Sequence, residues 1–175
     1  HIAAATGHTV IMGAGMGVAL YNILAKPSVT KVTLVEIEPK VIELLKQAAQ
    51  FEQWIGIDKL TIEISNALDF KPSEPVDHLF PDIWVTVDEP QALTETQGMQ
   101  HNIRAKTVGW WGQEFHFLAW LKAQNVTVLP PTLAQYQRWT NEIGLPLIEP
   151  DNPAYLACMA QLAQTAYYRT FHGEF

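Results

Sequence analysis

The stretch of sequence that decides the fold is Thr9–Glu36, TVIMGAGMGVALYNILAKPSVTKVTLVE. Its apolar run Val10–Met12 predicts a strand, and Val18–Leu24 predicts a short helix. Lys31–Glu36 alternates in polarity and is rich in β-branched residues, so it predicts a second strand. A strand, a tight turn, a helix and a second strand in this order are typical of a βαβ unit, which belongs to a parallel sheet.

Between the first strand and the helix, the run Gly13–Gly17 (GAGMG) has a glycine at every other position. Glycine lacks a Cβ atom, so the backbone can adopt positive φ and a ligand can lie against it. The helix that follows directs free N–H groups toward the same place. Glu36 lies about twenty residues beyond the glycines, where a βαβ unit presents a carboxylate to the two hydroxyls of a ribose. A glycine turn alone would be an ordinary turn, but together with this acid it predicts a nucleoside site.

The glycine spacing is G-x-G-x-G and not the G-x-G-x-x-G of dinucleotide folds, because Val18 and Leu20 occupy the sixth positions. This form resembles the first motif of the Rossmann-like (class I) S-adenosylmethionine-dependent methyltransferase superfamily. The stretch Lys26–Glu43, KPSVTKVTLVEIEPKVIE, is similar to the corresponding part of spermidine synthases, a branch of that superfamily that transfers an aminopropyl group. The resemblance covers residues 1–70 approximately and then fades.

The resemblance implies S-adenosylmethionine as the cofactor, with its methionine part along the glycines and its ribose on Glu36. The cofactor-binding residues that it implies are Gly13, Ala14, Gly15, Gly17, Glu36, Ile37, Asn66 and Ala67. The segment 65–70 (SNALDF) resembles the family segment that borders the adenine, where an aspartate usually precedes the alanine. Here Asn66 stands in that place, and its amide oxygen can accept a hydrogen bond from the adenine amino group. An asparagine that merely turns the chain is an equally supported interpretation.

The predicted catalytic groups are Asp88 and Glu89. Lys71–Pro81 contains three prolines and predicts a loop, and Asp82–Asp88 then predicts a buried fourth strand. In a sheet of order 3-2-1-4-5, ligands bind outside the carboxyl ends of strands 1 and 4, so both acids are expected beside the glycine turn. A carboxylate there would orient an amine or a hydroxyl and accept its proton. A carboxylate that caps the next helix is the alternative.

The rest of the chain completes a predicted α/β fold, a doubly wound and mostly parallel sheet with a helical C-terminal part and no evident final antiparallel strands. We interpret 1–175 as one domain, either whole or a piece of a longer protein. Gln91–Lys106 is polar and is expected to form a lid. The further predicted elements are helices at Lys40–Phe51, Thr107–Ala123, Thr132–Ile143 and Asn152–Phe171, and strands at Leu60–Ile64 and Val126–Leu129.

The composition of the chain limits the kinds of molecule that it is expected to bind. The formal net charge of −7 argues against a nucleic-acid groove and favours a small molecule, for example an amine. No apolar run is long enough to span a bilayer. A single cysteine, Cys158, and the lack of a visible signal peptide predict a cytoplasmic protein. The histidine spacing predicts no metal site. Aromatic residues on the last predicted helix, such as Tyr155 and Tyr167, would form either a homodimer contact or part of the core.

Three functions follow from these patterns. The first is methyl transfer from S-adenosylmethionine to a small molecule, which the glycine spacing and Glu36 favour. The second is an aminopropyl transfer, favoured by the similarity at Lys26–Glu43 and by the acids Asp88 and Glu89. The third is a non-catalytic relative that keeps the fold and binds a nucleoside, which is favoured by Asn66 and by the departure of the last third from the family.

Overall fold

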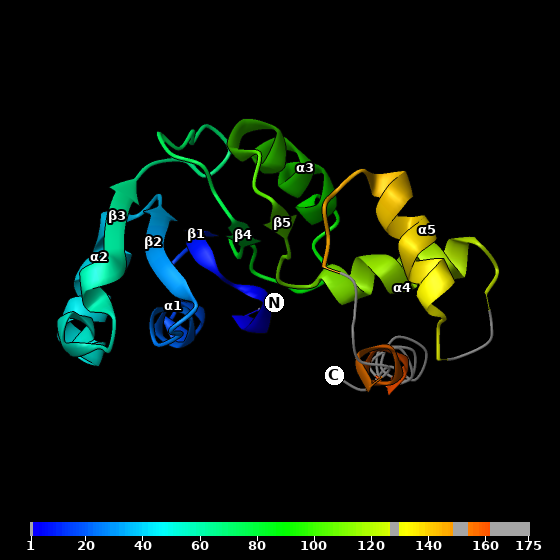
Figure 1. The fold of residues 1–175 in the computed structure, drawn as a ribbon, viewed down its shortest axis with the longest axis horizontal. Coiled ribbons are helices and arrows are strands. Elements are labelled where there is room, and N and C mark those ends of the chain that lie inside the picture. The colour runs from blue at the N-terminus through cyan, green and yellow to red at the C-terminus, as the bar shows by residue number, and fades with distance from the viewer. Residues whose placement is uncertain (1, 127–129, 149–153, 162–175) are drawn as a thin grey trace.

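The structure is a computed structural model that describes residues 2–126, 130–148 and 154–161. Its centre is a five-stranded sheet in the order β3-β2-β1-β4-β5 (Figure 1). All four pairings between neighbouring strands are parallel. The strands are β1 (Gly7–Met12), β2 (Val29–Glu36), β3 (Leu60–Ile64), β4 (His78–Pro81) and β5 (Thr107–Val108). The predicted fold class and strand order are therefore confirmed.

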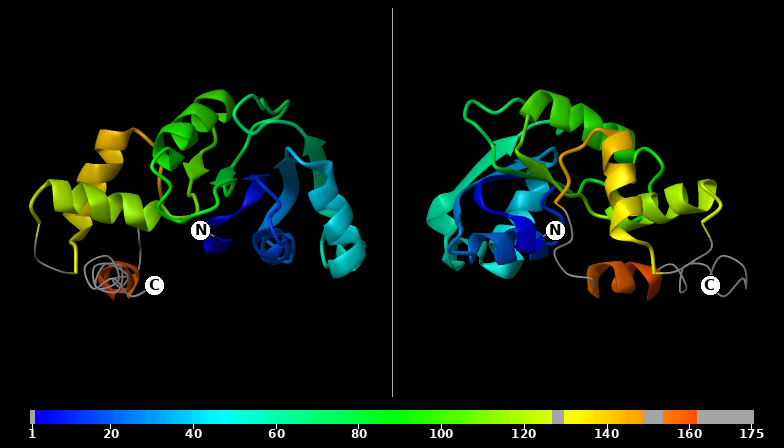
Figure 2. Two further views of the ribbon diagram at one scale, coloured as in Figure 1. Left: turned by 180° about the vertical axis from the view of Figure 1, so that it is seen from behind. Right: turned by 45° about the vertical axis from the view of Figure 1, so that its right-hand side comes forward.

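Helices cover both faces of this sheet. They are α1 (Val18–Leu24), α2 (Pro39–Ala49), α3 (Ala92–Ile103), α4 (Gln113–Ala123) and α5 (Leu133–Ile143), with short 3₁₀ turns η1 (Ile2–Ala4), η2 (Phe51–Gln53) and η3 (Ile57–Lys59). Residues 154–161 are also helical. Figures 1 and 2 show α4 and α5 beside the β5 end of the sheet, whereas α1 and α2 lie by β1, β2 and β3.

Alternation along β1 explains why one strand can serve two layers. Successive side chains of a strand point to opposite faces, and Ile11 packs in one apolar cluster with Leu34 and with residues of α1 and α2. Its neighbours Val10 and Met12 pack in the other cluster, together with residues of α3, α4 and α5. Each face of β1 is thus buried, which is typical of the central strand of a parallel α/β sheet.

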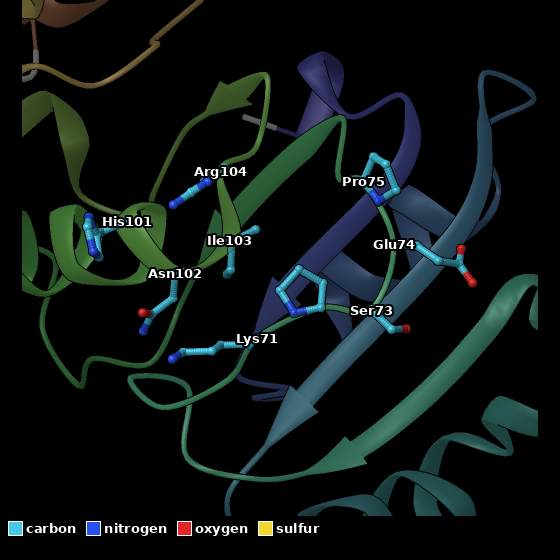
Figure 3. A pocket seen from close by; sticks show the side chains of 9 residues that line it. Lys71, Ser73, Glu74, Pro75, His101, Asn102, Ile103 and Arg104 are labelled. Carbon is cyan, nitrogen blue, oxygen red and sulfur yellow. The ribbon is translucent and has the colours of Figure 1, made fainter.

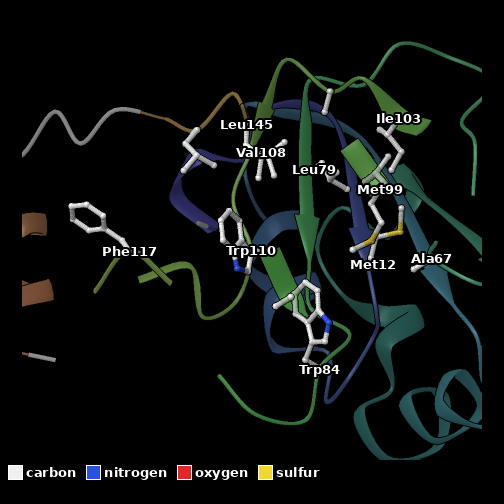
Figure 4. Packing of buried hydrophobic residues seen from close by; sticks show 14 of the residues in the cluster. Met12, Ala67, Leu79, Trp84, Met99, Ile103, Val108, Trp110, Phe117 and Leu145 are labelled. Atoms are coloured by element: carbon white, nitrogen blue, oxygen red, sulfur yellow. The ribbon is translucent and has the colours of Figure 1, made fainter. Parts of the chain in front are cut away.

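The cluster on the α3 side is rich in aromatic rings beyond β5. Trp139 of α5 lies with its ring centroid 5.1 Å from that of Phe117 and 6.0 Å from that of Trp110. Figure 4 shows Trp110 beside Val108. All three rings are buried, so these aromatic contacts join α4 and α5 to the edge of the sheet. Trp110 is therefore a core residue.

The predicted fourth strand is wrong. Asp82–Asp88 forms bends and turns, and β4 is instead His78–Pro81, at the end of the segment that predicted a loop. The error followed the apolar letters Ile83, Trp84 and Val85, which have a strand-like composition. In the structure Trp84 is buried, but Val85 is 91% exposed, so the run is not a buried strand.

Two further expectations for the second half need correction. Gln91–Lys106 is not an irregular lid, because α3 runs through it with Met99 and Ile103 buried against the sheet. The segment Thr107–Ala123, predicted as one helix, begins with the strand β5 at Thr107–Val108. Its helix, α4, starts only at Gln113. Gly112 precedes α4 at φ 90°, and a Cβ there would lie 1.9 Å from the carbonyl oxygen of Val87, so the chain has to turn before the helix begins.

The other predictions for the C-terminal part have mixed outcomes. The fifth strand of the described sheet is β5 and not Val126–Leu129, of which residues 127–129 lie outside the described part. Thr132–Ile143 is confirmed as α5, which has Thr132 as its N-cap. Of the predicted helix 152–171, only 154–161 is described, and that segment is helical. Leu147 forms a single parallel bridge with Val108, and the described residues contain no antiparallel strand pair.

Candidate functional site

The glycine turn follows β1 directly and is held against its neighbours by the backbone. The N–H of Gly13 donates to the carbonyl of Val35, at 2.8 Å, and the turn closes with Gly17 N–H donating to Ala14 at 2.9 Å. Gly13 has φ 91°, and a Cβ on it would lie 2.2 Å from the carbonyl oxygen of Asp82. Gly13 therefore permits the turn to pass directly beside the end of β4.

Gly15 at the tip of the turn has different surroundings. It also has positive φ, 48°, but a Cβ placed on it would meet no atom within 4 Å. The next residue, Met16, is 88% exposed, so the outer side of the turn is uncovered. The backbone at Gly15 is therefore open on this side, and its contact with a ligand stays a prediction. Gly17, the third glycine, forms the N-cap of α1.

Glu36 is the last residue of β2, and its side chain reaches the glycine turn. Its Oε2 accepts a hydrogen bond from Ala14 N–H at 2.8 Å, and its Oε1 accepts one from Glu38 N–H at 2.9 Å. The residue is only 8% exposed, so the two donors partly offset the cost of burying a carboxylate. An ionised carboxylate has about four acceptor positions. The glycine turn and the acid therefore meet, and acceptor capacity is left for a ligand.

The remaining cofactor-binding residues that the sequence predicts follow β2 and β3. Ile37 is 68% exposed, and Ala67 is buried in the apolar cluster on the α3 side. The amide oxygen of Asn66 accepts Leu68 N–H at 3.0 Å, and its nitrogen donates to Asp69 at 3.0 Å. Asn66 thus turns the chain, as one of the two interpretations expected. Its contact with an adenine stays a prediction.

Asp82 is a further candidate site residue, which the sequence did not indicate. Its N–H donates to the carbonyl of Met12 at 2.8 Å, which places it where the chain leaves β4 beside β1. Burial raises the pKa of its carboxyl group above the usual value, and its side chain has no polar partner among the described residues. The missed signal is an acid directly after the strand next to β1, where the strand order reverses and open α/β sheets bind ligands.

The predicted catalytic acids lie farther along the same loop. Gly112 packs against the carbonyl of Val87, so Asp88 and Glu89 approach the start of α4. There the backbone of Glu89 and the charge of Asp88 act on His116. Burial lowers the pKa of this imidazole, against these two opposing effects. Glu89 also accepts a hydrogen bond from the hydroxyl of Thr86 at 3.2 Å. Since the strand that would have carried the two acids to the glycine turn does not exist, their catalytic role stays a prediction.

The described residues contain no group of three histidine, cysteine, aspartate or glutamate side chains that could hold a metal ion. Among the described helices, none combines the length and the apolar character that crossing a bilayer requires. Tyr155, one of the predicted contact aromatics, packs within the chain. Its hydroxyl donates to Glu114 at 2.9 Å, and its ring lies edge-on to that of Tyr136. Tyr167 lies outside the described residues.

No protein-family model matches the chain, and no curated protein sequence matches it significantly. Solved structures with a similar fold include N-methyltransferase NodS from Bradyrhizobium japonicum in complex with S-adenosyl-L-homocysteine, at 15% identity and a TM-score of 0.41. That similarity covers 56% of this chain and 45% of NodS. Spermidine synthase from Thermotoga maritima is 24% identical, with a TM-score of 0.42, over 58% of this chain and 34% of the synthase.

A third similar structure is the 23S rRNA methyltransferase ErmE, at 13% identity and a TM-score of 0.43. The similarity covers 59% of this chain and 36% of ErmE. The chain thus spans less than half the length of each of the three. Two of the three are methyltransferases and the other is a spermidine synthase.

Proposed function

We propose that this chain binds S-adenosylmethionine at the glycine turn and transfers its methyl group to a small molecule. The observation that carries the proposal is the 2.8 Å hydrogen bond between Ala14 N–H and the carboxylate of Glu36. It joins an open glycine backbone and a buried acid at the carboxyl ends of the strands, where β1 and β4 end. This edge is the usual ligand site of open parallel sheets.

The residues present suit a nucleoside with a flexible charged tail. Glu36 keeps acceptor positions for two neighbouring ribose hydroxyls, because Oε2 accepts one hydrogen bond from Ala14 and Oε1 accepts one from Glu38. The bare backbone at Gly15 offers room for the tail, and the exposed side chain of Ile37 offers an apolar surface for a base. When bound, S-adenosylmethionine supplies an electrophilic methyl group.

Asp82 is the first candidate for the group that handles the acceptor. It lies next to Gly13, and burial raises the pKa of its carboxyl group, which makes the ionised form a stronger base than an ordinary aspartate. It would hold an amine or a hydroxyl of the acceptor and accept its proton. Asp88 and Glu89 are second candidates for this role. The net charge of −7 supports a small or cationic acceptor and not a nucleic acid.

An aminopropyl transfer is the second candidate function, and the observation that favours it is the similarity of Lys26–Glu43 to spermidine synthases. A non-catalytic nucleoside-binding protein would use Glu36 and Gly15 in the same way but would not need Asp82. A cytoplasmic location belongs to the proposal as well. The free and exposed thiol of Cys158 supports a reducing compartment.

Calorimetric titration with S-adenosylmethionine, and with its decarboxylated form, tests the proposal. We expect heat with S-adenosylmethionine, whereas a preference for the decarboxylated form would select aminopropyl transfer. Heat without transfer to any of a panel of amines would select the non-catalytic protein. An absence of heat with both compounds contradicts the proposed cofactor.

Two matched pairs of variants locate the binding. G15A adds a methyl group to the open face of the turn, and G144A adds one at φ 66° with equally open surroundings, at the end of α5. E36Q removes the carboxylate at the end of β2, and E63Q removes an exposed one on β3. We expect about tenfold or greater weakening with E36Q, since a hydrogen bond to a charged group contributes about 1.5–3 kcal/mol. G15A should weaken binding as well, because its methyl group would occupy the place where a ligand lies against the backbone. G144A and E63Q should bind like the wild type, and equal weakening within a pair would place the site elsewhere.

A further inference from the structure

An open cavity lies away from the glycine turn. The loop between β3 and β4 and the end of α3 line its volume of about 460 Å³ (Figure 3). On one side of it, the carbonyl of Pro75 accepts a hydrogen bond from the His8 ring at 2.9 Å. Glu74 pairs with Lys31 at 2.9 Å. His8 and Lys31 lie near the amino ends of β1 and β2. The cavity is therefore at the amino ends of the strands, whereas Glu36 lies at the carboxyl end of β2.

The cationic side chains of this cavity differ from most others in the molecule because they have no acid or carbonyl partner. Most lysines and arginines in residues 2–126 and 130–148 have an acid or a carbonyl as partner, for example Lys59 with two backbone carbonyls and Lys106 with Asp77. In this part of the chain, the charged side-chain groups without such a partner are those of Lys40, Lys71 and Arg104. Two of these three cations, Lys71 and Arg104, line the cavity.

Glu74, the acidic residue that lines the cavity, does not neutralise the charges of Lys71 and Arg104. Glu74 is held by Lys31, whose ammonium group lowers the pKa of that carboxyl group through a hydrogen bond and through its charge. Figure 3 shows the carboxylate of Glu74 pointing away from Lys71, Asn102 and Arg104. In a chain with a net charge of −7, the cavity is therefore a local site of uncompensated positive charge.

The wall that carries these groups is held in place. The side-chain amide of Asn102 donates to the carbonyl of Leu68 at 2.8 Å, which ties the end of α3 to the loop that follows β3. Arg104 ends α3 with φ 56°, a conformation that is uncommon for residues other than glycine. Its N–H donates to the carbonyl of Gln100 at 2.8 Å, so the backbone that carries the guanidinium group is fixed.

We propose that this cavity binds a phosphorylated small molecule through Lys71 and Arg104. A phosphate dianion matches two cations, and a guanidinium fork with an ammonium group is a common combination around phosphate oxygens. The hydroxyl of Ser73 and the imidazole of His101 also line the cavity and add hydrogen-bonding groups. Ligand pockets in proteins have volumes of roughly 300–1,000 Å³. The cavity therefore has room for the organic part of such a molecule as well as for its phosphate group.

Titration of the amide NMR spectrum with ribose 5-phosphate, ribose and inorganic phosphate tests this proposal. We expect ribose 5-phosphate to shift the amide signals of Lys71, Ser73, Glu74 and residues 101–104, inorganic phosphate to shift them with weaker affinity, and ribose to leave them unchanged. A citrate titration separates phosphate from carboxylate recognition. If citrate binds as tightly as ribose 5-phosphate, the proposed ligand class is overturned.

Substitutions of the two cations test their role. K71Q and R104N should each weaken ribose 5-phosphate binding about tenfold, because a hydrogen bond to a charged group is lost. Asparagine is chosen at position 104 because it tolerates positive φ. K40Q removes the remaining unpaired cation outside the cavity and is expected to bind like the wild type. If K71Q and R104N also bind like the wild type, or if ribose 5-phosphate shifts no signal, the proposal is wrong. Since neither residue contacts the glycine turn, binding of S-adenosylmethionine should stay unchanged, and the two proposals can fail independently.

Discussion

Compared with β1, β2 and β3, which have six, eight and five residues, β4 and β5 are short, with four and two. β1 pairs with β2 at six positions, with one register shift between Gly7 and His8, and β2 pairs with β3 at five, whereas β5 pairs with β4 at only two. The cores differ in the same sense. Aliphatic side chains dominate the α1 and α2 side, and stacked or tilted aromatic rings hold α4 and α5 at the other end.

This difference shows two ways of positioning an element. A long strand is positioned by its own hydrogen-bonded ladder, so its pattern of alternation is visible in the sequence. A strand of two residues gains little from its ladder, so its place depends on what packs around it. For β5, Trp110 and Leu147 provide that packing. The region of β4, β5, α4 and α5 should therefore depend more on single aromatic side chains than the region of β1, β2 and β3 does.

The largest expected effect is on the aromatic cluster. W139A should lower the free energy of unfolding by about 3–5 kcal/mol, because it empties a buried site that contacts Trp110, Phe117 and Tyr136. W54A, the same substitution in the β1–β3 region, should cost less because Trp54 is only partly buried. Urea unfolding followed by far-UV circular dichroism measures both. Equal losses would remove the distinction between the two regions.

The second prediction concerns the contact between the two regions. G13A should lower the free energy of unfolding by about 2–3 kcal/mol, because its Cβ would collide with the backbone of Asp82 in a strained conformation. G144A adds the same methyl group at φ 66° in open space and should cost only about 1 kcal/mol. Thermal and urea unfolding of the pair separate collision from backbone strain. A cost for G13A no larger than that for G144A would mean that β1 and β4 can move apart.

The third prediction tests how much of the α5 region is determined locally. Thr132 accepts the N–H of Gln135 at 3.2 Å, and the Gln135 side chain accepts the N–H of Thr132 at 2.7 Å, which together form a capping box. T132A should cost about 1 kcal/mol, and T132S should retain most of the stability. Urea unfolding midpoints provide the comparison. If T132A has no effect, packing of the aromatic rings alone determines where α5 begins.

The smallest expected effect is a pH dependence at the glycine turn. Burial raises the pKa of Asp82 in the folded protein above its usual 3.8, so the folded state holds this proton more tightly than the unfolded state. Stability is therefore greatest below the unfolded pKa and falls as the pH rises toward the folded pKa, above which the penalty is complete. D82N should raise stability at pH 7 by up to about 1 kcal/mol and have no such effect near pH 3.

The control for this prediction is D58N, which changes an exposed aspartate of η3 and should leave stability almost unchanged at both pH values. Urea unfolding at the two pH values measures all three proteins. A loss of stability in D82N at pH 7 would show that the carboxylate has a favourable partner. The same variant should abolish methyl transfer if Asp82 handles the acceptor.

The β1–β3 region was predictable because its signals are local and redundant. The glycine turn, the alternation of Lys31–Glu36 and the acid that ends it each indicate the same βαβ unit, and Glu36 lies by the turn as expected. α3 was missed although its buried residues Ala92, Thr96, Met99 and Ile103 have helical spacing. Thr96 is polar, and Gly98 lies on the same helix, so the apolar pattern was too sparse to identify it.

The position of Asp82 beside the glycine turn could not be predicted from the sequence in the same way. Ile83, Trp84 and Val85 look more like a strand than His78–Pro81 does, yet only the latter pairs with β1. Which of two short apolar segments enters a sheet depends on the partners that each can bury, and those partners lie far away in the chain. Asp82 is a candidate site residue only because β4 lies beside β1 in the structure.

By itself, the sequence determined the βαβ unit and its nucleoside-site pattern, because turn glycines, alternation and helix spacing act between residues close in the chain. Only the tertiary structure decided which segments became β4 and β5, that the backbone of Asp82 lies against Gly13, and that Lys71 and Arg104 share a cavity. These outcomes depend on burial between distant segments. Burial energy follows the surface that is removed from water, and the order of residues alone does not specify that surface.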